Sequence, residues 1–592
     1  KDDSYGGDSN GDGDVTAPAA GNWGYVYLAN STSLANMIVK YGSHNIYLSN
    51  TASLSYIYSS VGNSYNVFGD GGATSVTITD CYFTGSNSVG VYLAGVNGAV
   101  VSVDRSKFLR NNGHGLYLVN GSMTMLDSSE ANDNGQFGVY TSQENAATAQ
   151  SFTWNKFVNN GQVGLSVGSV KSSPISINDN VFDGNGQEGL LSSKATIQNN
   201  SFIGNRVPLA LQLNVGSTYA GNVFTGNAYN NVIGLRSIYS SPSNLKGTLS
   251  LTTPAGLAAG VYLLMESEDV RTGDTLLIEP GVIVKGMAST NLSVDGTLIA
   301  DGTPASPIVF TSYRDHSVGG KVNLVADTLA PAVNNWSGLY VSSNPVTTML
   351  DNVKIFYATY GLYTSGNWNN QISYVTVEHN QYATYISTGV VVLESPIARY
   401  NTYGITGLNT VDMTIRNAVA SYNTYYGIQY YPTYSTPVGG LRELSNSQVI
   451  GNGYAGVFVE PAQIPQVYVG NTISSNGRYG VWNNNLNQPA TDVQFIGNTV
   501  SNNVWEGIVS SRSRFVDNTF SGNRHGIGMM GNLGHIYTDN TGTDNNQFSG
   551  NRRPAIAVFA SGWGSVSVTD TLQRSFPAGI TTGVYNVMTD LS

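Results

Sequence analysis

A short repeat, present in both halves of the chain, is the feature that most restricts the possible fold. In the first half, a glycine that precedes an apolar pair recurs at spacings of 25, 23, 26 and 25 residues, at Gly90, Gly115, Gly138, Gly164 and Gly189. In the second half, the same glycine recurs at spacings of 23, 29, 24 and 27 residues, at Gly404, Gly427, Gly456, Gly480 and Gly507. Units of this length are too small to bury a core alone, so each must stack on its neighbours.

Within each unit, two or three short runs of alternating apolar and polar residues are separated by Asn, Asp and Gly, as in "SVTITDCYF" followed by "TGSNSVG". Short β-branched runs bounded by turn residues are typical of strands, and Asn-Gly steps supply the positive φ of tight corners. No stretch shows a sustained period of 3.6 residues, so helices are expected to be minor. The pattern predicts an all-β fold, a right-handed parallel β-helix (β-solenoid) in which each unit is one coil.

A second, longer repeat divides the chain. The segment "KDDSYGGDSNGDGDVTAPAAGNWGYVYL" aligns without a gap to "RDHSVGGKVNLVADTLAPAVNNWSGLYV", at an offset of 313 residues (314 − 1 and 336 − 23). It predicts two tandem modules, residues 1–250 and 251–592, with residues 251–313 as bridging and opening coils. Trp23 and Trp336 occupy equivalent places before a strand, and we expect both to be packing anchors.

Both ends of the chain fall inside the array formed by the long repeat. The bridging segment that precedes Arg314 has no counterpart before Lys1, and the chain stops where a further one would begin. We therefore expect the 592 residues to be part of a longer repeat protein.

The units "NxFxxNGxxGV" and "NxFxGNxxxGI", together with the bridge "GDTLLIEPGVIVKG" and the following "NNWSGLYV", carry a resemblance. The chain resembles the parallel β-helix repeat family found in bacterial secreted and cell-surface proteins. The resemblance covers most of the chain and implies an extracellular, surface location. This scaffold hosts lyases, glycosidases, adhesins and spacers, so the resemblance favours a fold more strongly than a function.

Composition excludes some partners. Charged residues are 11% of the chain, against about 25% in ordinary globular proteins, and the net charge is −11. Without a basic stripe to neutralise phosphates, no nucleic-acid partner is expected. No apolar run approaches the roughly 20 residues that a membrane-spanning helix requires, so no membrane span is expected in this chain.

The acidic opening "DSNGDGD" has the spacing of a calcium loop. Asp8, Asn10 and Asp12 occupy positions one, three and five, Gly13 the turn, and the Asp14 carbonyl position seven. Position twelve is Ala19 instead of Glu, so a closing carboxylate would come from elsewhere, such as Asp2 or Asp3. The pattern predicts a structural Ca²⁺ in the first copy, with a solvated Gly/Asp turn as the alternative.

A tyrosine column is the most suggestive binding feature. The residue before the repeat glycine is aromatic in several units of the second half, and Trp482 lies nearby; the candidate ligand-binding residues are Tyr360, Tyr382, Tyr403, Tyr426, Tyr479 and Trp482. If the units stack in register, aromatic rings line up along a rigid rod and can contact a polysaccharide at many points. The alternative is a corner ladder that only stabilises the sheet.

Catalysis would need close carboxylates or a base beside acids on an exposed face. One loose cluster, Glu506, Arg524 and His525, is the weak candidate. The expected function is therefore a non-catalytic adhesive or structural surface rod that contacts polysaccharide, or another cell-surface or matrix component. A polysaccharide lyase or glycoside hydrolase is one alternative. A filament subunit that associates head to tail through its open sheet ends is another.

Overall fold

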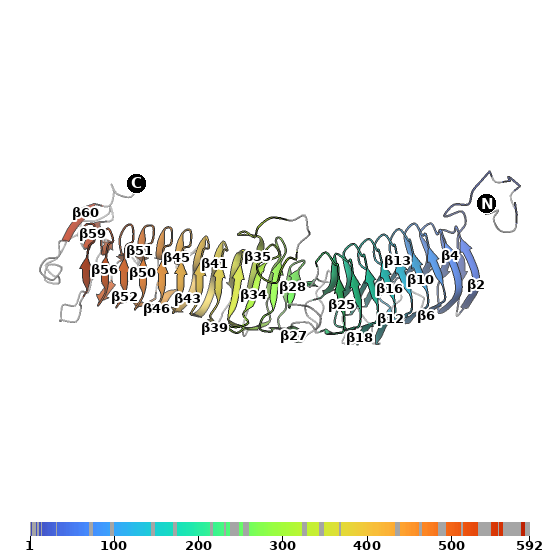
Figure 1. Cartoon of the computed structure of the whole chain (residues 1–592), viewed down its shortest axis with the longest axis horizontal. Helices are drawn as coiled ribbons and strands as arrows, with labels where there is room; N and C mark the ends of the chain where they lie inside the picture. The colour runs from blue at the N-terminus through green and yellow to red at the C-terminus, as the bar shows by residue number, and fades with distance from the viewer. Residues whose placement is uncertain are drawn as a thin grey trace. The chain divides into compact units, whose positions relative to one another are not determined.

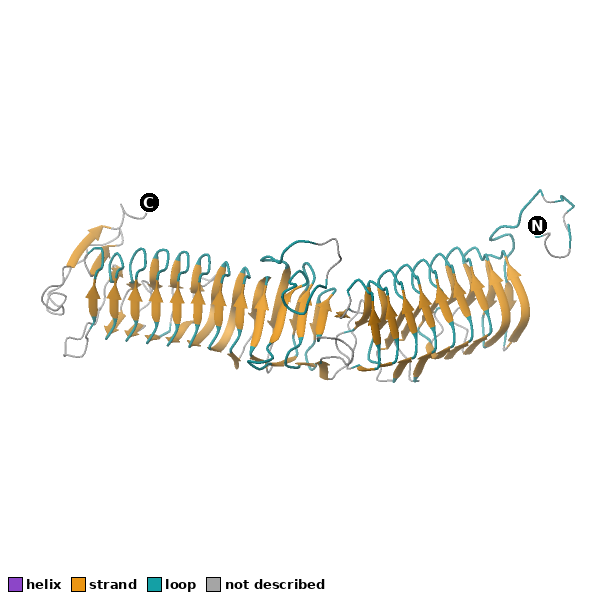
Figure 2. Cartoon of the chain, viewed as in Figure 1, coloured by secondary structure: helices purple, strands orange, loops and turns teal. Residues whose placement is uncertain are grey.

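The computed structural model describes most of the chain. The described residues are 2, 7–8, 11–13, 15–30, 32–69, 75–94, 100–143, 149–169, 174–212, 217–229, 232–236, 248–252, 260–322, 328–342, 348–365, 369–431, 439–460, 464–483, 493–510, 513–530, 546–553, 556–560 and 582–586. Within them the regular structure consists of β-strands, with no helix (Figure 2). The described part accordingly contains no helix long and apolar enough to cross a membrane.

The chain forms two compact units. Unit 1 comprises residues 1–266 and 316–328, and unit 2 comprises residues 267–315 and 329–592. In each unit the strands recur in the same order along the chain and pair in parallel with the strand one coil away, so that every coil contributes to three ladders (Figure 1). This is the predicted parallel β-solenoid.

Unit 1 has three ladders of parallel strands. The first ladder contains β1 (Val26–Leu28), β3 (His44–Leu48), β5 (Tyr65–Gly69), β8 (Val89–Leu93), β11 (Leu116–Val119), β14 (Val139–Gln143), β17 (Leu165–Ser169), β20 (Glu188–Ser192), β23 (Val207–Leu211), β26 (Val232–Leu235) and β28 (Val261–Leu264). The second contains β2 (Thr32–Lys40), β4 (Ala52–Ser60), β6 (Ser75–Thr79), β9 (Val100–Asp104), β12 (Ser122–Asp127), β15 (Gln150–Thr153), β18 (Ile175–Asn178), β21 (Thr196–Gln198) and β24 (Thr218–Ala220). The third continues from the C-terminal half of β4 through β7 (Tyr82–Thr84), β10 (Lys107–Leu109), β13 (Glu130–Asn132), β16 (Lys156–Val158), β19 (Val181–Asp183), β22 (Ser201–Ile203) and β25 (Val223–Thr225). Strand β27 (Thr248–Leu251) also lies in this unit.

Unit 2 repeats the arrangement. Its first ladder contains β29 (Glu268–Val270), β32 (Asn291–Val294), β35 (Trp336–Ser342), β38 (Ala358–Ser365), β41 (Tyr382–Glu394), β43 (Tyr403–Arg416), β45 (Tyr426–Tyr431), β48 (Ala455–Val459), β51 (Tyr479–Asn483), β54 (Ile508–Ser510), β57 (Ile527–Met530), β59 (Ile556–Ala560) and β60 (Thr582–Asn586). The second contains β30 (Thr275–Ile278), β33 (Thr297–Asp301), β36 (Thr348–Asp351), β39 (Asn369–Ser373), the C-terminal halves of β41 and β43, β46 (Gly440–Ser445), β49 (Gln466–Val469), β52 (Val493–Ile496) and β55 (Ser513–Val516). The third contains β31 (Ile283–Gly286), β34 (Ile308–Ser312), β37 (Val353–Phe356), β40 (Thr376–Glu378), β42 (Ile397–Arg399), β44 (Val419–Ser421), β47 (Gln448–Ile450), β50 (Thr472–Ser474), β53 (Thr499–Ser501), β56 (Thr519–Ser521) and β58 (Gln547–Ser549).

The phenylalanine of the "NxF" motif fills the core. In unit 1, Phe157, Phe182 and Phe202 lie one coil apart with centroids 5.1 and 4.9 Å from each other, and all are at most 1% exposed. Burying one such side chain favours folding by about 1.5–3 kcal/mol. Stacked identical side chains therefore give each coil the apolar contacts that it cannot make alone.

Asparagines at the corners form continuous hydrogen-bonded ladders. Asn401, for example, accepts the backbone N–H of Asn380 through Oδ1 at 2.9 Å, and its own Nδ2 donates to Oδ1 of Asn423 at 3.1 Å. The same Nδ2 also donates to the Val377 carbonyl at 2.9 Å. In unit 2, one ladder of this kind contains Asn380, Asn401, Asn423, Asn452, Asn476, Asn503, Asn523 and Asn551. Buried corner backbone groups are thus satisfied from the neighbouring coil, which a chain turn alone could not achieve.

We expect Asn401→Ala to destabilise its coil. The substitution leaves the N–H of Asn380 without its acceptor inside the protein, at a cost of about 1–3 kcal/mol per orphaned group. Because long solenoids do not unfold in one step, the measurement is amide hydrogen exchange, which should accelerate at Asn380 and in adjacent coils. The matched control is Asn417→Gly at an exposed corner with φ of 52°, which should leave exchange in the core unchanged. Unchanged exchange at Asn380 in the Asn401 variant would contradict a stabilising role for the ladder.

Candidate functional site

Tyrosines stack in register on the outer face of the first ladder of unit 2. Tyr360 pairs with Tyr382, and Tyr382 with Tyr403, in successive coils. Their ring centroids are 5.3 and 4.7 Å apart, and their planes differ by 12° and 11°. The structure thus brings these three sequence-predicted residues into one column at single-coil spacing.

The other predicted residues continue this column less regularly. Tyr426 lies 6.4 Å from Tyr403, and the strand pairings place Ala455 and then Tyr479 in line after it. Tyr479 is only 5% exposed and packs edge-on against Trp505 at 5.4 Å. The exposed part of the column therefore runs from Tyr360 to Tyr426, and Tyr479 acts as packing.

A second column runs beside the first, two residues beyond the repeat glycine. Tyr340 stacks on Tyr363 at 5.1 Å, and Tyr363 on Tyr385 at 5.5 Å. Trp482 belongs to this second column, where its indole lies 6.5 Å from Phe458 and its N–H donates to Glu460 Oε1 at 3.1 Å. We call the two columns together the aromatic face of unit 2.

The rings of this face are partly covered and partly open. Stacked atoms approach to about 3.5–4.0 Å, so a centroid separation near 5 Å means that neighbouring rings are offset sideways. Tyr382 and Tyr385, in adjacent columns, meet at 80°. Five tyrosines of this face are half-buried, namely Tyr360, Tyr363, Tyr382, Tyr385 and Tyr403. Each therefore keeps an accessible part of its side chain at the surface.

Burial raises the pKa of two phenols of this face. It raises the pKa of Tyr382 to about 12, and the nearby phenols of Tyr403 and Tyr360 add to the effect. The pKa of Tyr426 is also raised to about 12, chiefly by burial and then by Tyr454. These two hydroxyls therefore remain hydrogen-bond donors and acceptors over the whole physiological pH range.

Unit 1 carries an aromatic face that was not predicted from the sequence. On the first ladder, six side chains lie in register, with neighbouring centroids between 4.9 and 5.6 Å: Tyr27, Tyr47, Phe68, Tyr92, Tyr117 and Tyr140. The signal was present in "VGVYL", "HGLYL" and "FGVYT", where Tyr stands two residues after the glycine. In the first half of the chain, the prediction considered only the residue before the glycine.

A partial second column accompanies the first in unit 1. His44 lies between Tyr25 and Tyr65, at 6.3 and 5.2 Å, and His114 packs on Tyr117 at 4.9 Å and on Phe137 at 5.1 Å. Burial lowers the pKa of His114 to about 4, so its ring is neutral at physiological pH. The two units therefore present chemically similar faces: aromatic, uncharged and lined with hydroxyl groups.

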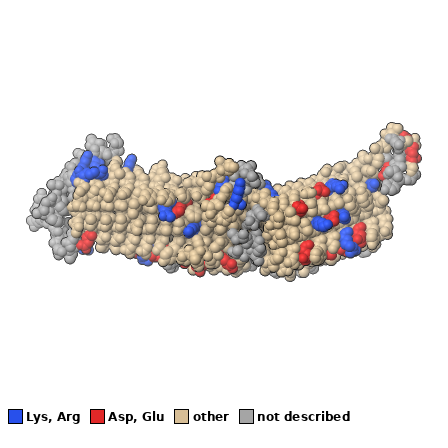
Figure 3. Space-filling view, viewed as in Figure 1, with Lys and Arg blue, Asp and Glu red and all other residues tan. Residues whose placement is uncertain are grey.

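The face drawn in Figure 3 shows charged side chains only as scattered small groups, separated by wide uncharged areas. Several of the described charges also pair with one another, as Arg416 does with Glu443 at 2.8 Å. The columns themselves consist mainly of Tyr, Phe and Trp side chains, so a ligand of the aromatic faces would be recognised through rings and hydroxyls more than through charge.

The weak catalytic candidates are brought together but not exposed. His525 Nδ1 lies 3.0 Å from Glu506 Oε1, and the two residues are 1% and 3% exposed. Arg524 is half-buried, and its backbone N–H bonds the Trp505 carbonyl at 2.7 Å. A carboxylate and an imidazole buried against each other are out of reach of a polymer substrate.

The predicted calcium loop is only partly described. Asn10, Asp14 and Asp3 lie outside the described residues. The Asp8 carboxylate accepts the backbone N–H groups of Gly11 and Gly13, both at 2.7 Å, so it folds the loop around itself. No group of three or more His, Cys, Asp or Glu side chains gathers at a metal-binding distance within the described residues. Calcium binding stays a prediction.

The calcium prediction has a direct test. If Ca²⁺ holds the loop, adding it after EDTA treatment should raise the melting temperature of the N-terminal coils by a few degrees, since ligand binding to the folded state stabilises it. Asp12→Ala should abolish the rise, whereas Asp133→Asn, at an exposed corner elsewhere, should keep it. Equal melting curves with and without calcium would contradict calcium binding and favour the solvated Gly/Asp turn.

Alkaline titration should separate two classes of tyrosine. The pKa values of Tyr382 and Tyr426 are raised from 10.0 to about 12. Their contribution to stability is therefore fully present below pH 10 and lost as the pH rises through about 12. We expect tyrosinate absorbance to develop in two steps, with unfolding of unit 2 accompanying the second. A single step near the ordinary pKa would show that the face does not bury its phenols.

Known proteins support the fold assignment. The family model for the right-handed β-helix region matches residues 25–172, 96–246, 332–483 and 438–583, and these matches together cover more than half of the chain. They coincide with the coils that carry the Asn ladders and the aromatic faces, and they support a right-handed course. A search of curated proteins finds no match. The chain belongs to the right-handed β-helix family.

Proposed function

We propose that this chain is a non-catalytic, extracellular surface protein whose aromatic faces bind polysaccharide. The observation that carries the proposal is the register of Tyr360, Tyr382 and Tyr403, with Tyr340, Tyr363 and Tyr385 beside them. A stack of rigid coils that presents such a face to its surroundings would suit an adhesive or spacer role on a cell surface.

The chemistry of the face suits a neutral, hydroxyl-rich polymer. Sugar rings present apolar C–H patches and hydroxyls, which match offset aromatic rings and neutral phenols. Each such contact contributes only a modest free energy of binding. Because contacts repeat once per coil, a polymer that engages several coils gains affinity by multivalency.

The buried state of Glu506 and His525 favours a binding role over catalysis. General acid and base groups must reach the reacting bond of the substrate within hydrogen-bond distance. In this structure the two side chains contact each other at 3.0 Å and are covered from solvent. A lyase or hydrolase remains the alternative function, to be separated by product analysis.

The test is an affinity screen against soluble and insoluble polysaccharides, with and without EDTA, in which reducing ends and unsaturated products are assayed in parallel. We expect binding without products. Tyr382→Ala combined with Tyr403→Ala should weaken binding by about tenfold, which corresponds to about 1.4 kcal/mol. The loss should appear without a change of fold.

The matched control is Tyr374→Asn. Tyr374 is 57% exposed and stands at a corner with φ of 51°, away from both columns, so its replacement should leave binding unchanged. Equal loss in the control would show that binding does not depend on the face. Products that disappear in Glu506→Gln would instead support the enzyme.

A further inference from the structure

One coil position of unit 2, two residues before the repeat glycine, carries arginines interleaved with aromatic residues. Backbone hydrogen bonds of 2.6–2.9 Å join the residues at this position from coil to coil, in the order Tyr425, Tyr454, Arg478, Trp505, Arg524 and Arg553. Three of the six are arginines, and none is acidic. The column borders the aromatic face of unit 2, because Tyr425 stacks on Tyr403 at 5.1 Å and Tyr454 meets Tyr426 edge-on at 5.3 Å.

The exposed Arg478 is held between two aromatic rings. Its guanidinium carbon lies 4.5 Å from the ring centroid of Tyr454 and 4.8 Å from that of Trp505. Its Nη1 also donates to the Tyr454 hydroxyl at 3.3 Å. Cation–π contacts with two rings fix the plane of the guanidinium. Further hydrogen bonds can therefore form at its edge, where arginine binds carboxylates in bidentate geometry.

Unit 2 neutralises other arginines with its own carboxylates. Three of them each pair with an acid of a neighbouring coil, namely Arg399 with Glu378, Arg416 with Glu443 and Arg442 with Asp412. Within the part of the chain that the structure describes, no carboxylate lies at ion-pair distance from the Arg478 guanidinium. Glu506, which follows Trp505 in the chain, is 3% exposed and lies 3.0 Å from His525 Nδ1. This carboxylate is therefore covered from solvent and directed to the imidazole.

Further arginines extend the positive charge over the following coils. Arg524 is half-buried, and Arg552 and Arg553 are exposed. Arg552 Nη2 donates to the Asn503 carbonyl at 3.1 Å, which holds its guanidinium against the same corner. Figure 3 shows a group of basic side chains in blue near the end of unit 2 that carries β56. In a chain with a net charge of −11, this corner is a local concentration of positive charge.

We propose that this arginine column, defined as Tyr454, Arg478, Trp505, Arg524 and Arg553, binds the carboxylate groups of an acidic polysaccharide. Arg478 supplies a guanidinium of fixed orientation, and the two later arginines add positive charge along the same line. The inference goes beyond the proposed function, which concerns a neutral polymer at the aromatic faces.

The spacing of the arginines suits a polymer with widely separated charges. Successive coils lie about 4.8 Å apart, so three arginines occupy about 14 Å of the column. Duplex DNA carries one charge for about every 1.7 Å of its axis and needs a denser set of cations. An acidic polysaccharide with one carboxylate on each charged sugar matches the column better.

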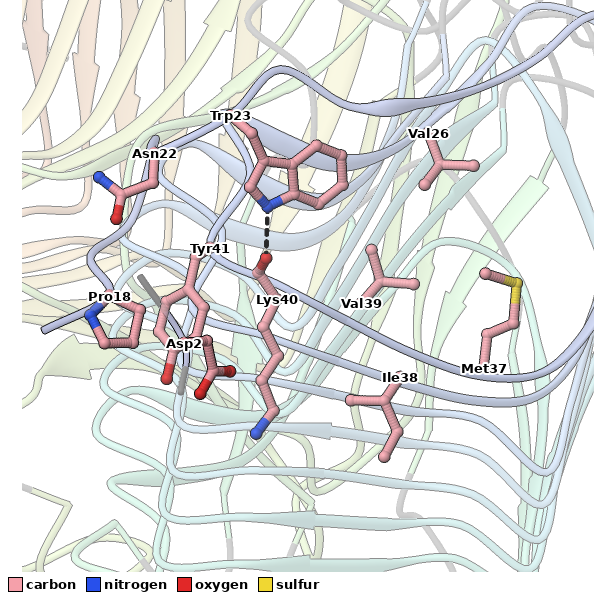
Figure 4. Close-up of a pocket in the computed structure, with 10 residues that line it drawn as sticks. All are labelled: Asp2, Pro18, Asn22, Trp23, Val26, Met37, Ile38, Val39, Lys40 and Tyr41. Atoms are coloured by element: carbon pink, nitrogen blue, oxygen red, sulfur yellow. Dashed lines mark hydrogen bonds between the residues drawn. The ribbon is translucent and has the colours of Figure 1, made fainter. Parts of the chain in front are cut away.

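Lys40 of unit 1 provides a comparison. Its ammonium also lies beside an aromatic ring, 5.7 Å from the centroid of Tyr58. The hollow next to it is lined by Asp2 and by Trp23, whose indole donates to the Lys40 carbonyl at 2.7 Å (Figure 4). A carboxylate of the chain itself therefore accompanies this cation, and we expect no site for an external carboxylate there.

The test measures binding of a fluorescently labelled homopolymer of a uronic acid to the full chain, with its methyl ester as the matched neutral polymer. We expect the acid form to bind more tightly than the ester, and to bind less tightly as salt is added, since exposed charges are screened. Arg478→Gln combined with Arg524→Gln should weaken binding of the acid form by at least about tenfold, as expected for lost charge-assisted hydrogen bonds. Arg478→Lys should lose part of the affinity, because an ammonium keeps the charge without the planar fork.

Two control variants each remove one positive charge elsewhere. Arg514→Gln changes an exposed arginine on β55, in the same coil as Arg524 but on another ladder. Lys40→Gln changes the cation of the comparison site. Both variants should bind the acid form as the unmodified chain does.

Three results would overturn the proposal: equal affinity for the acid form and the ester, unchanged affinity in the double arginine variant, or an equal loss in Arg514→Gln. Inorganic polyphosphate is the second probe. If it binds as tightly as the acid form, with the same dependence on Arg478, the column is a general polyanion site and the assignment to polysaccharide is wrong. Binding of the ester that depends on Tyr382 and Tyr403 reports on the aromatic face alone, so the two proposals can fail separately.

Discussion

The structure depends on the register between successive coils. Parallel strand pairing and the corner Asn ladders both bond each residue to its counterpart one coil away, as Asn380, Asn401 and Asn423 do in unit 2. A shift of one residue would turn apolar side chains outward and break the ladder at once. Register is therefore fixed by many small contributions to the free energy of folding, all of which are lost together when the register shifts. As a result, residues at the same position in successive coils form a column along the unit.

The aromatic faces are consequences of that register. A tyrosine that recurs in the sequence at one coil position must stack in space, about 4.8 Å from its neighbours in the hydrogen-bonding direction. Stacking buries part of each ring, which raises the pKa of Tyr382, while the sideways offset leaves part of the side chain open. Stabilisation of the sheet and binding of a ligand are therefore compatible in one column.

The sequence predicted the solenoid and the Tyr360–Tyr382–Tyr403 column because both depend on spacing alone. The face of unit 1 was missed for a physical reason. The strand begins after the glycine, so Leu116 points inward and Tyr117 outward, while His114 before the glycine belongs to the turn. The burial of Glu506 with His525, and the exposure of Trp23 at 37% against 1% for Trp336, could not be predicted, since both depend on what covers these side chains.

We propose that the aromatic faces are the contact surface for polysaccharide. Hydroxyl-radical footprinting of the full chain, free and saturated with a bound polysaccharide, tests it most directly. We expect the bound polysaccharide to protect Tyr360, Tyr382, Tyr385 and Tyr403 from oxidation. Tyr374 and Tyr422 should be oxidised equally in both states. Protection confined to corner residues, with the tyrosines of the two columns unchanged, would contradict it.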